Sequence, residues 1–189
     1  EDFFPPKKFE LPQLTEKKKE QIKDIFASIY PKKISFSDSD RLFVSLGKSY
    51  YDVIRIFNGG GFVSPDVAIS PTTHEEIQYI LTQATANNVY IIPFGGGTNV
   101  VGALSLDNLA TKPEIKCTLD LRNYKRLINI DTEHLTATFE AGIFGPELEK
   151  TLNAKGYTLG HFPQSFEYST LGGWLVTRGA GQESTYYGK

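Results

Sequence analysis

The sequence has little that would cross-link it, anchor it in a membrane or attract nucleic acid. A single cysteine among 189 residues excludes an internal disulfide framework and is typical of a reducing compartment. No apolar stretch approaches the roughly 20 residues of a membrane span, and the N-terminus shows no signal-peptide core. The formal net charge of −2 and the pI near 6.0 provide no basic field, so nucleic acid is not an expected partner.

Methionine is also absent, even at position 1, so we expect the chain to begin inside a longer protein. Cys117 lies in a strand-like run, which predicts a small buried core residue and not a nucleophile. The three histidines have no metal-ligand spacing, so no metal site is expected. His74 and His134 are predicted at the surface. His161 lies in a glycine- and serine-rich segment, where either a direct role at a site or an ordinary structural hydrogen bond is open.

Residues 1–64 are predicted to form an extended N-terminal arm, over residues 1–14, followed by a small helical segment. A first helix is expected after Thr15 and a second from residues 39–41 onward, because apolar residues recur there at helix spacing. The three glycines at residues 59–61 indicate a joint before a main domain over residues 65–189.

In the main domain short strands alternate with helices, which predicts a mixed α+β fold. Thr73 and Glu76 form a capping-box pattern at the start of one helix, and Gly145-Pro146 opens another. Strands are expected at residues 66–69 and 89–92 and in a hairpin of residues 127–130 and 135–140, with His134 at its tip.

A glycine loop, Gly95-Gly96-Gly97-Thr98, follows the second of these strands directly. Consecutive glycines let backbone amides approach a ligand closely and form a concave site for phosphate oxygens, although a tight structural turn has the same composition. No lysine follows the glycines, which excludes a Walker loop. The spacing also differs from the Rossmann pattern G-x-G-x-x-G, so a dinucleotide would have to be bound in another fold.

A second segment, residues 160–181, is dense in small and hydroxyl residues and offers many backbone donors. Gly172-Gly173 beside Trp174 indicates a helix that is approached closely by another backbone or by a ligand. A simple structural turn does not explain why two such segments occur in one short chain.

Together these two segments resemble the vanillyl-alcohol-oxidase-type (PCMH-type) FAD-binding family. The motif Gly160-His161-x-Pro163-x-Ser165-x-Glu167-x-Ser169-Thr170-x-Gly172-Gly173-Trp174, followed by Thr177-Arg178, is similar to the alkyldihydroxyacetonephosphate synthase family of ether-lipid enzymes. The resemblance covers roughly residues 30–189. It implies an α+β PCMH-type domain, incomplete at its C-terminal end, in a chain that is inactive alone because the catalytic residues lie elsewhere in the enzyme.

The resemblance also implies cofactor-binding residues. The first loop would wrap the FAD diphosphate, the second segment would contact the flavin and ribityl portion, and a third contact would follow. Relatives often have Asp in place of Gln164 and Ser in place of Ala180, so we expect backbone contacts at these two positions. The residues implied are Pro93, Phe94, Gly95, Gly96, Gly97, Thr98 and Asn99; Gln164, Ser165, Phe166, Glu167, Tyr168, Ser169 and Thr170; and Thr177, Arg178, Gly179 and Ala180.

The activity implied is a transferase reaction without net redox change, in which the acyl group of acyl-dihydroxyacetone phosphate is replaced by a long-chain fatty alcohol. The resemblance further implies a peroxisomal enzyme, a homodimer and contact with the peroxisomal membrane surface. A D-lactate or glycolate dehydrogenase-like flavoprotein is the alternative within the same fold. A non-catalytic binding module, in which the glycine loop is only a turn, is the alternative of another class.

Thr98 predicts that the FAD is bound non-covalently, because oxidases of this fold that attach the flavin carry a histidine at that place and threonine cannot make the bond. Acid denaturation of the yellow protein, followed by separation of chain and supernatant, should release all flavin absorbance into the supernatant. Flavin absorbance that remains on the precipitated chain would contradict the prediction.

Overall fold

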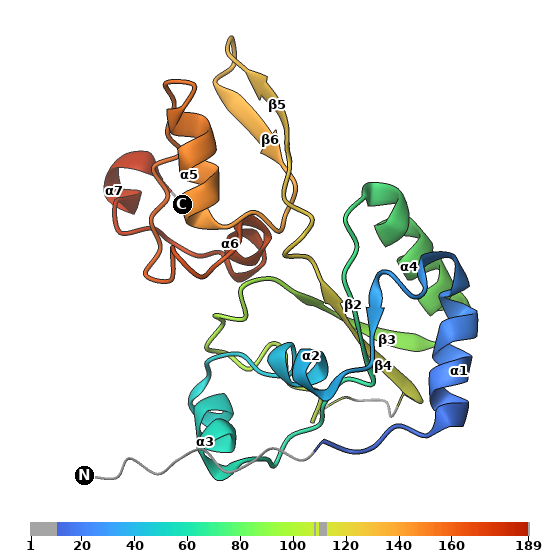
Figure 1. The fold of residues 1–189 in the computed structure, drawn as a ribbon. Coiled ribbons are helices and arrows are strands. Elements are labelled where there is room, and N and C mark those ends of the chain that lie inside the picture. The colour runs from blue at the N-terminus through green and yellow to red at the C-terminus, as the bar shows by residue number, and fades with distance from the viewer. Residues whose placement is uncertain (1–10, 108, 110–112, 189) are drawn as a thin grey trace. The chain divides into compact units, whose positions relative to one another are not determined.

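The protein is described by a computed structural model that covers residues 11–107, 109 and 113–188 and consists of two compact units (Figure 1). The first unit holds the chain up to Phe94 together with Asn99–Asp120, and the second holds Gly95–Thr98 together with the chain from Leu121 onward. Residues 1–10 of the predicted arm lie outside the described residues. The predicted boundary between residues 64 and 65 stays a prediction.

Three helices form most of the N-terminal part. α1 (Glu16–Ile25) is capped by the Thr15 side chain, as predicted, and continues as a short 3-10 turn, η1 (Ala27–Ile29). α2 (Asp38–Phe43) begins slightly before the predicted start, because the Ser37 hydroxyl accepts a hydrogen bond from the Asp40 amide. None of the described helices is long and apolar enough to cross a membrane.

α3 (Tyr50–Asn58) was not predicted from the sequence, although Ser49 and Asp52 form a capping box at its start. Its apolar residues Tyr50, Tyr51 and Phe57 are exposed, so they do not mark a buried helix face in the sequence pattern. Gly59 ends the helix with a φ of 73°, so the glycine run at residues 59–61 begins as a helix cap.

Arg41 of α2 is the largest fully buried side chain and connects segments that are far apart in the sequence. Its Nε donates to the Pro65 carbonyl at 2.9 Å, and its Nη2 donates to the Pro12 carbonyl and the Ser64 hydroxyl, both at 3.2 Å. A planar guanidinium with five donors satisfies several buried acceptors at once. One side chain thereby holds the start of the chain, α2 and the entry to the sheet together.

The sheet of the first unit has the order β1-β2-β4-β3. β2 (Val67–Ile69), β4 (Ile115–Asp120) and β3 (Val89–Phe94) are parallel, and β1 (Ile34–Ser35) pairs with β2 in the antiparallel sense. β1 is only two residues long, so no sequence alternation revealed it. Pairing of β3 with β4 extends to Phe94, which fixes where the glycine loop leaves the carboxyl end of the strand.

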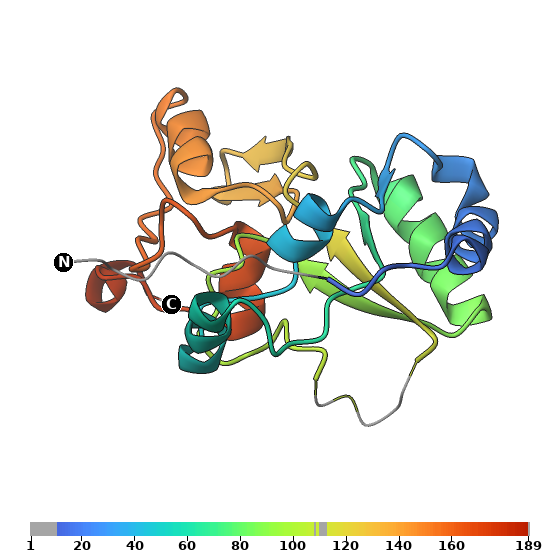
Figure 2. The same ribbon diagram turned by 60° about the horizontal axis from the view of Figure 1, so that its bottom comes forward.

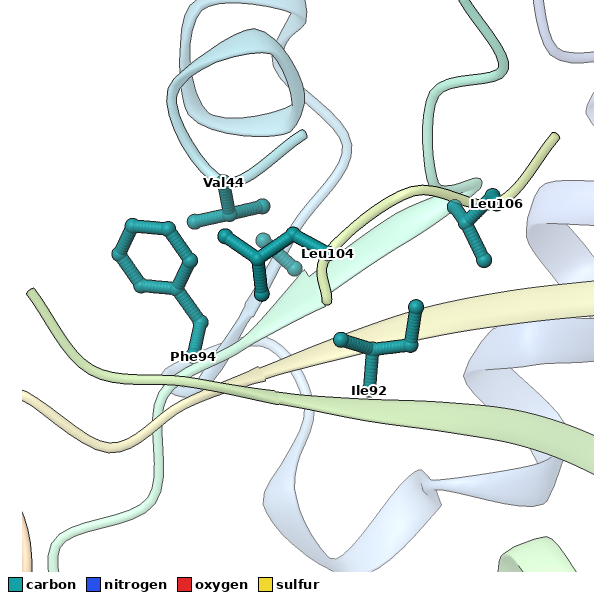
Figure 3. Close-up of a cluster of buried hydrophobic side chains, with 6 residues drawn as sticks. Val44, Ile92, Phe94, Leu104 and Leu106 are labelled. Atoms are coloured by element: carbon teal, nitrogen blue, oxygen red, sulfur yellow. The ribbon is translucent and has the colours of Figure 1, made fainter. Parts of the chain in front are cut away.

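Both faces of this sheet carry buried residues. On one face Val44, Ile92, Phe94, Leu104 and Leu106 pack into a cluster that also includes Ala68 (Figure 3). α4 (His74–Ala86) packs against β3 and lies next to α1 in both views (Figures 1 and 2), where the Tyr79 hydroxyl donates to the Ile25 carbonyl. The Cys117 side chain is buried as predicted, and burial raises the pKa of its thiol, so the thiol stays protonated.

The second unit contains the predicted hairpin, formed by β5 (Leu127–Asp131) and β6 (Thr136–Phe139), and three helices. His134 lies at the hairpin tip and is held by the Asp131 carboxylate, which accepts from its amide and contacts its Nδ1 at 2.9 Å. The helices are α5 (Gly145–Asn153), α6 (Leu171–Thr177) and α7 (Ser184–Tyr187).

A buried carboxylate closes the base of the hairpin. Glu140 accepts hydrogen bonds from Nε and Nη2 of Arg126 at 2.9 and 2.7 Å and from the Arg126 amide at 2.6 Å. Burial alone would raise the pKa of Glu140, but these hydrogen bonds from Arg126 outweigh it and hold the pKa below its ordinary value of 4.5. The charged form of Glu140 therefore stabilises the folded state.

Glu140→Gln should lower the free energy of unfolding at pH 7 by about 1–3 kcal/mol, because hydrogen bonds to a charged group are lost. The carboxylate contribution is complete above the ordinary pKa and is lost as the pH falls through the lowered one. Denaturant unfolding should therefore show the difference between variant and wild type narrowing as the pH falls below 4.5.

Glu147→Gln is the matched control, since the Glu147 and Lys125 side chains pair at 2.9 Å and are both far more exposed than that of Glu140. We expect it to change the free energy of unfolding by less than about 1 kcal/mol. A difference for Glu140→Gln that stays constant down to acidic pH would contradict the role given to its charge.

Candidate functional site

The glycine loop is half-buried and presents free backbone donors. β3 ends at Phe94, and Gly97 adopts a φ of 65°, a left-handed conformation that glycine reaches without steric cost. Within the described part of the chain, the amides of Gly96, Gly97 and Thr98 donate to no protein acceptor. Half-buried N–H groups without partners need an acceptor from outside the chain, and anionic oxygens are strong acceptors.

The absence of side chains in this loop lets it pack directly on the backbone of residues 168–170. A Cβ built on Gly96 would lie 1.8 Å from the carbonyl oxygen of Tyr168, and one built on Gly95 would lie 2.3 Å from Oγ1 of Thr170. Neither distance is compatible with any side chain. The two segments that sequence analysis singled out therefore meet within the second unit.

Residues 163–170 form two successive turns that end in α6. The Pro163 carbonyl accepts from the Phe166 amide, and the Ser165 carbonyl accepts from the amides of Tyr168 and Ser169. The Thr170 side chain then caps α6 by accepting from the Gly173 amide. Each of these hydrogen bonds joins residues only three or four positions apart, so the shape of this segment depends on its own sequence.

α6 is fixed by the turn and short connection that follow the hairpin. The amides of Leu171 and Gly172 donate to the carbonyls of Ile143 and Ala141 at 3.0 and 2.8 Å. A Cβ on Gly172 would lie 2.9 Å from that of Ala141, which confirms the predicted close approach of another backbone. The first turn of α6 is thereby tied to a second stretch of chain.

The C-terminal end of α6 carries the third predicted contact. The Thr177 hydroxyl donates to the Gly173 carbonyl, and the Gly179 amide donates to the Trp174 carbonyl at 2.9 Å. Arg178 adopts a φ of 50° between them and its side chain is exposed. A cavity of about 470 Å³ adjoins this end and is lined by Leu159, His161, Leu171, Trp174, Leu175, Arg178, Gly179, Tyr187 and Gly188.

His161 lies at this cavity, with its ring 4.9 Å from that of Trp174. Burial lowers the pKa of the imidazole, so the ring is neutral at neutral pH. Its Nε2 is buried without a hydrogen-bond partner. His74 and His134 are exposed, as predicted.

The predicted site residues differ in what their side chains can reach. The Phe94 ring belongs to the core of the first unit, and Ser169 and Thr170 are buried in the second, so these three can meet a ligand only through their backbone. The side chains of Pro93, Gln164, Glu167, Tyr168, Thr177 and Ala180 are exposed, and the remaining members of the set are intermediate, apart from Arg178 described above. Pro93, Phe94 and Asn99 belong to the first unit.

Sequence reasoning missed the residues that brace the site. The carbonyls of Ala141 and Ile143 hold α6, but backbone acceptors leave no trace in residue type. The hydrogen bond from Trp174 Nε1 to Ser169 Oγ, at 2.6 Å, joins two residues of the quoted motif. A tryptophan with a serine five residues before it is the sequence signal that would have revealed this hydrogen bond.

Residues 65–189, which include all of these segments, match the FAD binding domain family. The chain belongs to that family. FAD is its cofactor, and the donor set agrees with this: unpaired amides in a glycine loop suit a diphosphate, as they do in other nucleotide-binding loops. The α+β, PCMH-type fold class predicted from the sequence is confirmed.

Three similar proteins give the context of this chain. Alkyldihydroxyacetonephosphate synthase of Dictyostelium discoideum is 38% identical over 169 residues, which are 89% of this chain and 27% of that protein. A crystal structure of alkyldihydroxyacetonephosphate synthase matches with a TM-score of 0.85 and 36% identity, over 95% of this chain and 32% of that one. Glycolate oxidase subunit GlcD of Bacillus subtilis is 31% identical over 66% of this chain and 25% of its own length. The chain thus spans about a quarter of the curated relatives it matches.

Proposed function

We propose that this chain is the FAD-binding part of an alkyldihydroxyacetonephosphate synthase, an enzyme of ether-lipid synthesis. The reaction proposed is exchange of the acyl group of acyl-dihydroxyacetone phosphate for a long-chain fatty alcohol. The observation that carries it is the higher identity to the synthase, over more of the chain, than to the glycolate oxidase subunit. Because this match covers only 27% of the relative's length, the catalytic residues are proposed to lie in other parts of the enzyme.

Within the site we propose three roles. Pro93–Asn99 hold the diphosphate, Gln164–Thr170 contact the flavin and ribityl portion, and Thr177–Ala180 supply the third contact. The unpaired amides of Gly96, Gly97 and Thr98 support the first role, and the packing of residues 168–170 against the glycine loop supports the second. Thr98 supports non-covalent binding, because its side chain is not one that attaches a flavin.

The bound FAD would supply an electron sink for the reacting carbon of the substrate. The residues of this chain would bind and orient the FAD. The free amides of the glycine loop would fix its diphosphate near the start of α6, and exposed Arg178 lies at the C-terminal end of that helix. We further propose residues 1–64 and 65–189 as separate domains of a homodimeric peroxisomal enzyme that contacts the peroxisomal membrane surface. The domain boundary rests on the glycine run at residues 59–61, and the dimer, the compartment and the membrane contact rest on the synthase relationship alone.

The exchange reaction is testable with the full-length polypeptide that carries this chain. We expect labelled hexadecanol to enter acyl-dihydroxyacetone phosphate, with release of one fatty acid for each alcohol incorporated and no electron acceptor in the mixture. Bleaching of the flavin by D-lactate or glycolate under anaerobic conditions, without alcohol exchange, would favour the dehydrogenase. Failure to bind FAD at all would favour the non-catalytic module and contradict both enzyme proposals.

Gly96→Ala tests the diphosphate loop itself. The added Cβ would overlap the Tyr168 carbonyl, so the loop must move and its amides change position. We expect the dissociation constant for FAD, measured by flavin fluorescence quenching, to rise about 10-fold or more. Gly60→Ala is the control, because a Cβ at that position would have no atom within 4 Å. Unchanged FAD affinity in Gly96→Ala would show that the diphosphate is held elsewhere.

A further inference from the structure

Trp174, the single tryptophan of the chain, touches residues 161–169 at three places. Its ring lies 4.9 Å from that of His161 and is stacked on that of Phe166 at 6.2 Å with an interplanar angle of 15°. Its Nε1 donates to Oγ of Ser169 at 2.6 Å. α6 thus braces the segment that precedes it through one buried side chain.

The Ser169 hydroxyl makes two hydrogen bonds within the protein, one as donor and one as acceptor. It donates to the Ser165 carbonyl at 2.7 Å and accepts from Trp174, while the Ser169 amide also donates to the Ser165 carbonyl at 2.9 Å. A hydroxyl has a single proton, so donation to Ser165 turns a lone pair toward the indole. With both bonds made, the side chain of Ser169 has one orientation.

The backbone held in this way is the surface on which the glycine loop rests. A Cβ on Gly96 would lie 2.9 Å from Cα of Ser169, next to its overlap with the Tyr168 carbonyl. A small displacement of residues 168–170 therefore changes the space available to Gly96 and the direction of the loop amides. Such a displacement would alter ligand geometry before it unfolded the unit.

We infer that Trp174 is a positioning residue for the cofactor, and that its indole N–H acts through Ser169 on the backbone that supports the diphosphate loop. This inference rests on the proposed role of the glycine loop. The competing explanation is that Trp174 serves only as a core residue, since it also belongs to the cluster of Ile143, Leu148 and Leu152. A core role affects stability, whereas a positioning role also affects FAD affinity of the folded protein.

The test is a double-mutant cycle on FAD binding by the full-length polypeptide. Trp174→Phe keeps the ring contacts and removes the N–H, and Ser169→Ala removes its acceptor. We expect each variant to raise the calorimetric dissociation constant for FAD about 3- to 10-fold. The double variant should be no weaker than the weaker single variant, because both remove the same bond.

Leu152→Val is the stability control, because Leu152 is buried in the same cluster but lies on α5. It should lower the thermal midpoint and leave FAD affinity unchanged. The inference would be overturned if folded Trp174→Phe and Ser169→Ala bound FAD with wild-type affinity. It would also be overturned if the losses of affinity were additive in the double variant. In both cases the wild-type protein would still bind FAD. If Trp174→Phe does not fold, Ser169→Ala decides alone by its FAD affinity. Absence of FAD binding in the wild type would instead contradict the proposed function.

Discussion

The site depends on one steric constraint, which is that no side chain fits between the glycine loop and the 168–170 backbone. Gly96 faces the Tyr168 carbonyl at a distance where even a methyl group would overlap it. Two pieces of main chain that are about 70 residues apart in the sequence can therefore pack directly on each other. The amides of Gly96, Gly97 and Thr98 have no acceptor among the described residues, and this makes them available to an anion.

The 168–170 backbone can support this contact because hydrogen bonds to other segments of the second unit hold it in place. Thr170 caps α6, and the first amides of α6 bond to the carbonyls of Ile143 and Ala141. Those carbonyls follow Glu140, whose carboxylate is clamped by Arg126 at the base of the hairpin. A series of hydrogen bonds thus connects the base of the hairpin to the backbone on which the glycine loop rests.

Most elements of the fold were predictable because their determinants are local. The capping box of Thr73 and Glu76, the strand before the glycine loop and the hairpin around His134 all depend on residues within a few positions. β1 and α3 were missed for opposite reasons: β1 is too short to show alternation, and α3 exposes its aromatic residues. For the candidate site, glycine and hydroxyl density singled out two segments that the structure brings together, while the close approach of Gly96 to Tyr168 is a property of the folded backbone alone.

Main-chain donors of the kind that the glycine loop offers carry no information about a reaction. Phe94, Ser169 and Thr170 direct their side chains into the protein, so a ligand in this region meets amides whose chemistry is the same in every residue. A diphosphate bound by amides can serve an exchange reaction or a dehydrogenase equally well. Chemical differences in this region come from side chains that remain exposed, and Arg178 brings a positive charge to the cavity at the end of α6. A fixed cation favours an anionic group only if that group reaches it, so the position of Arg178 at the cavity matters more than its charge alone.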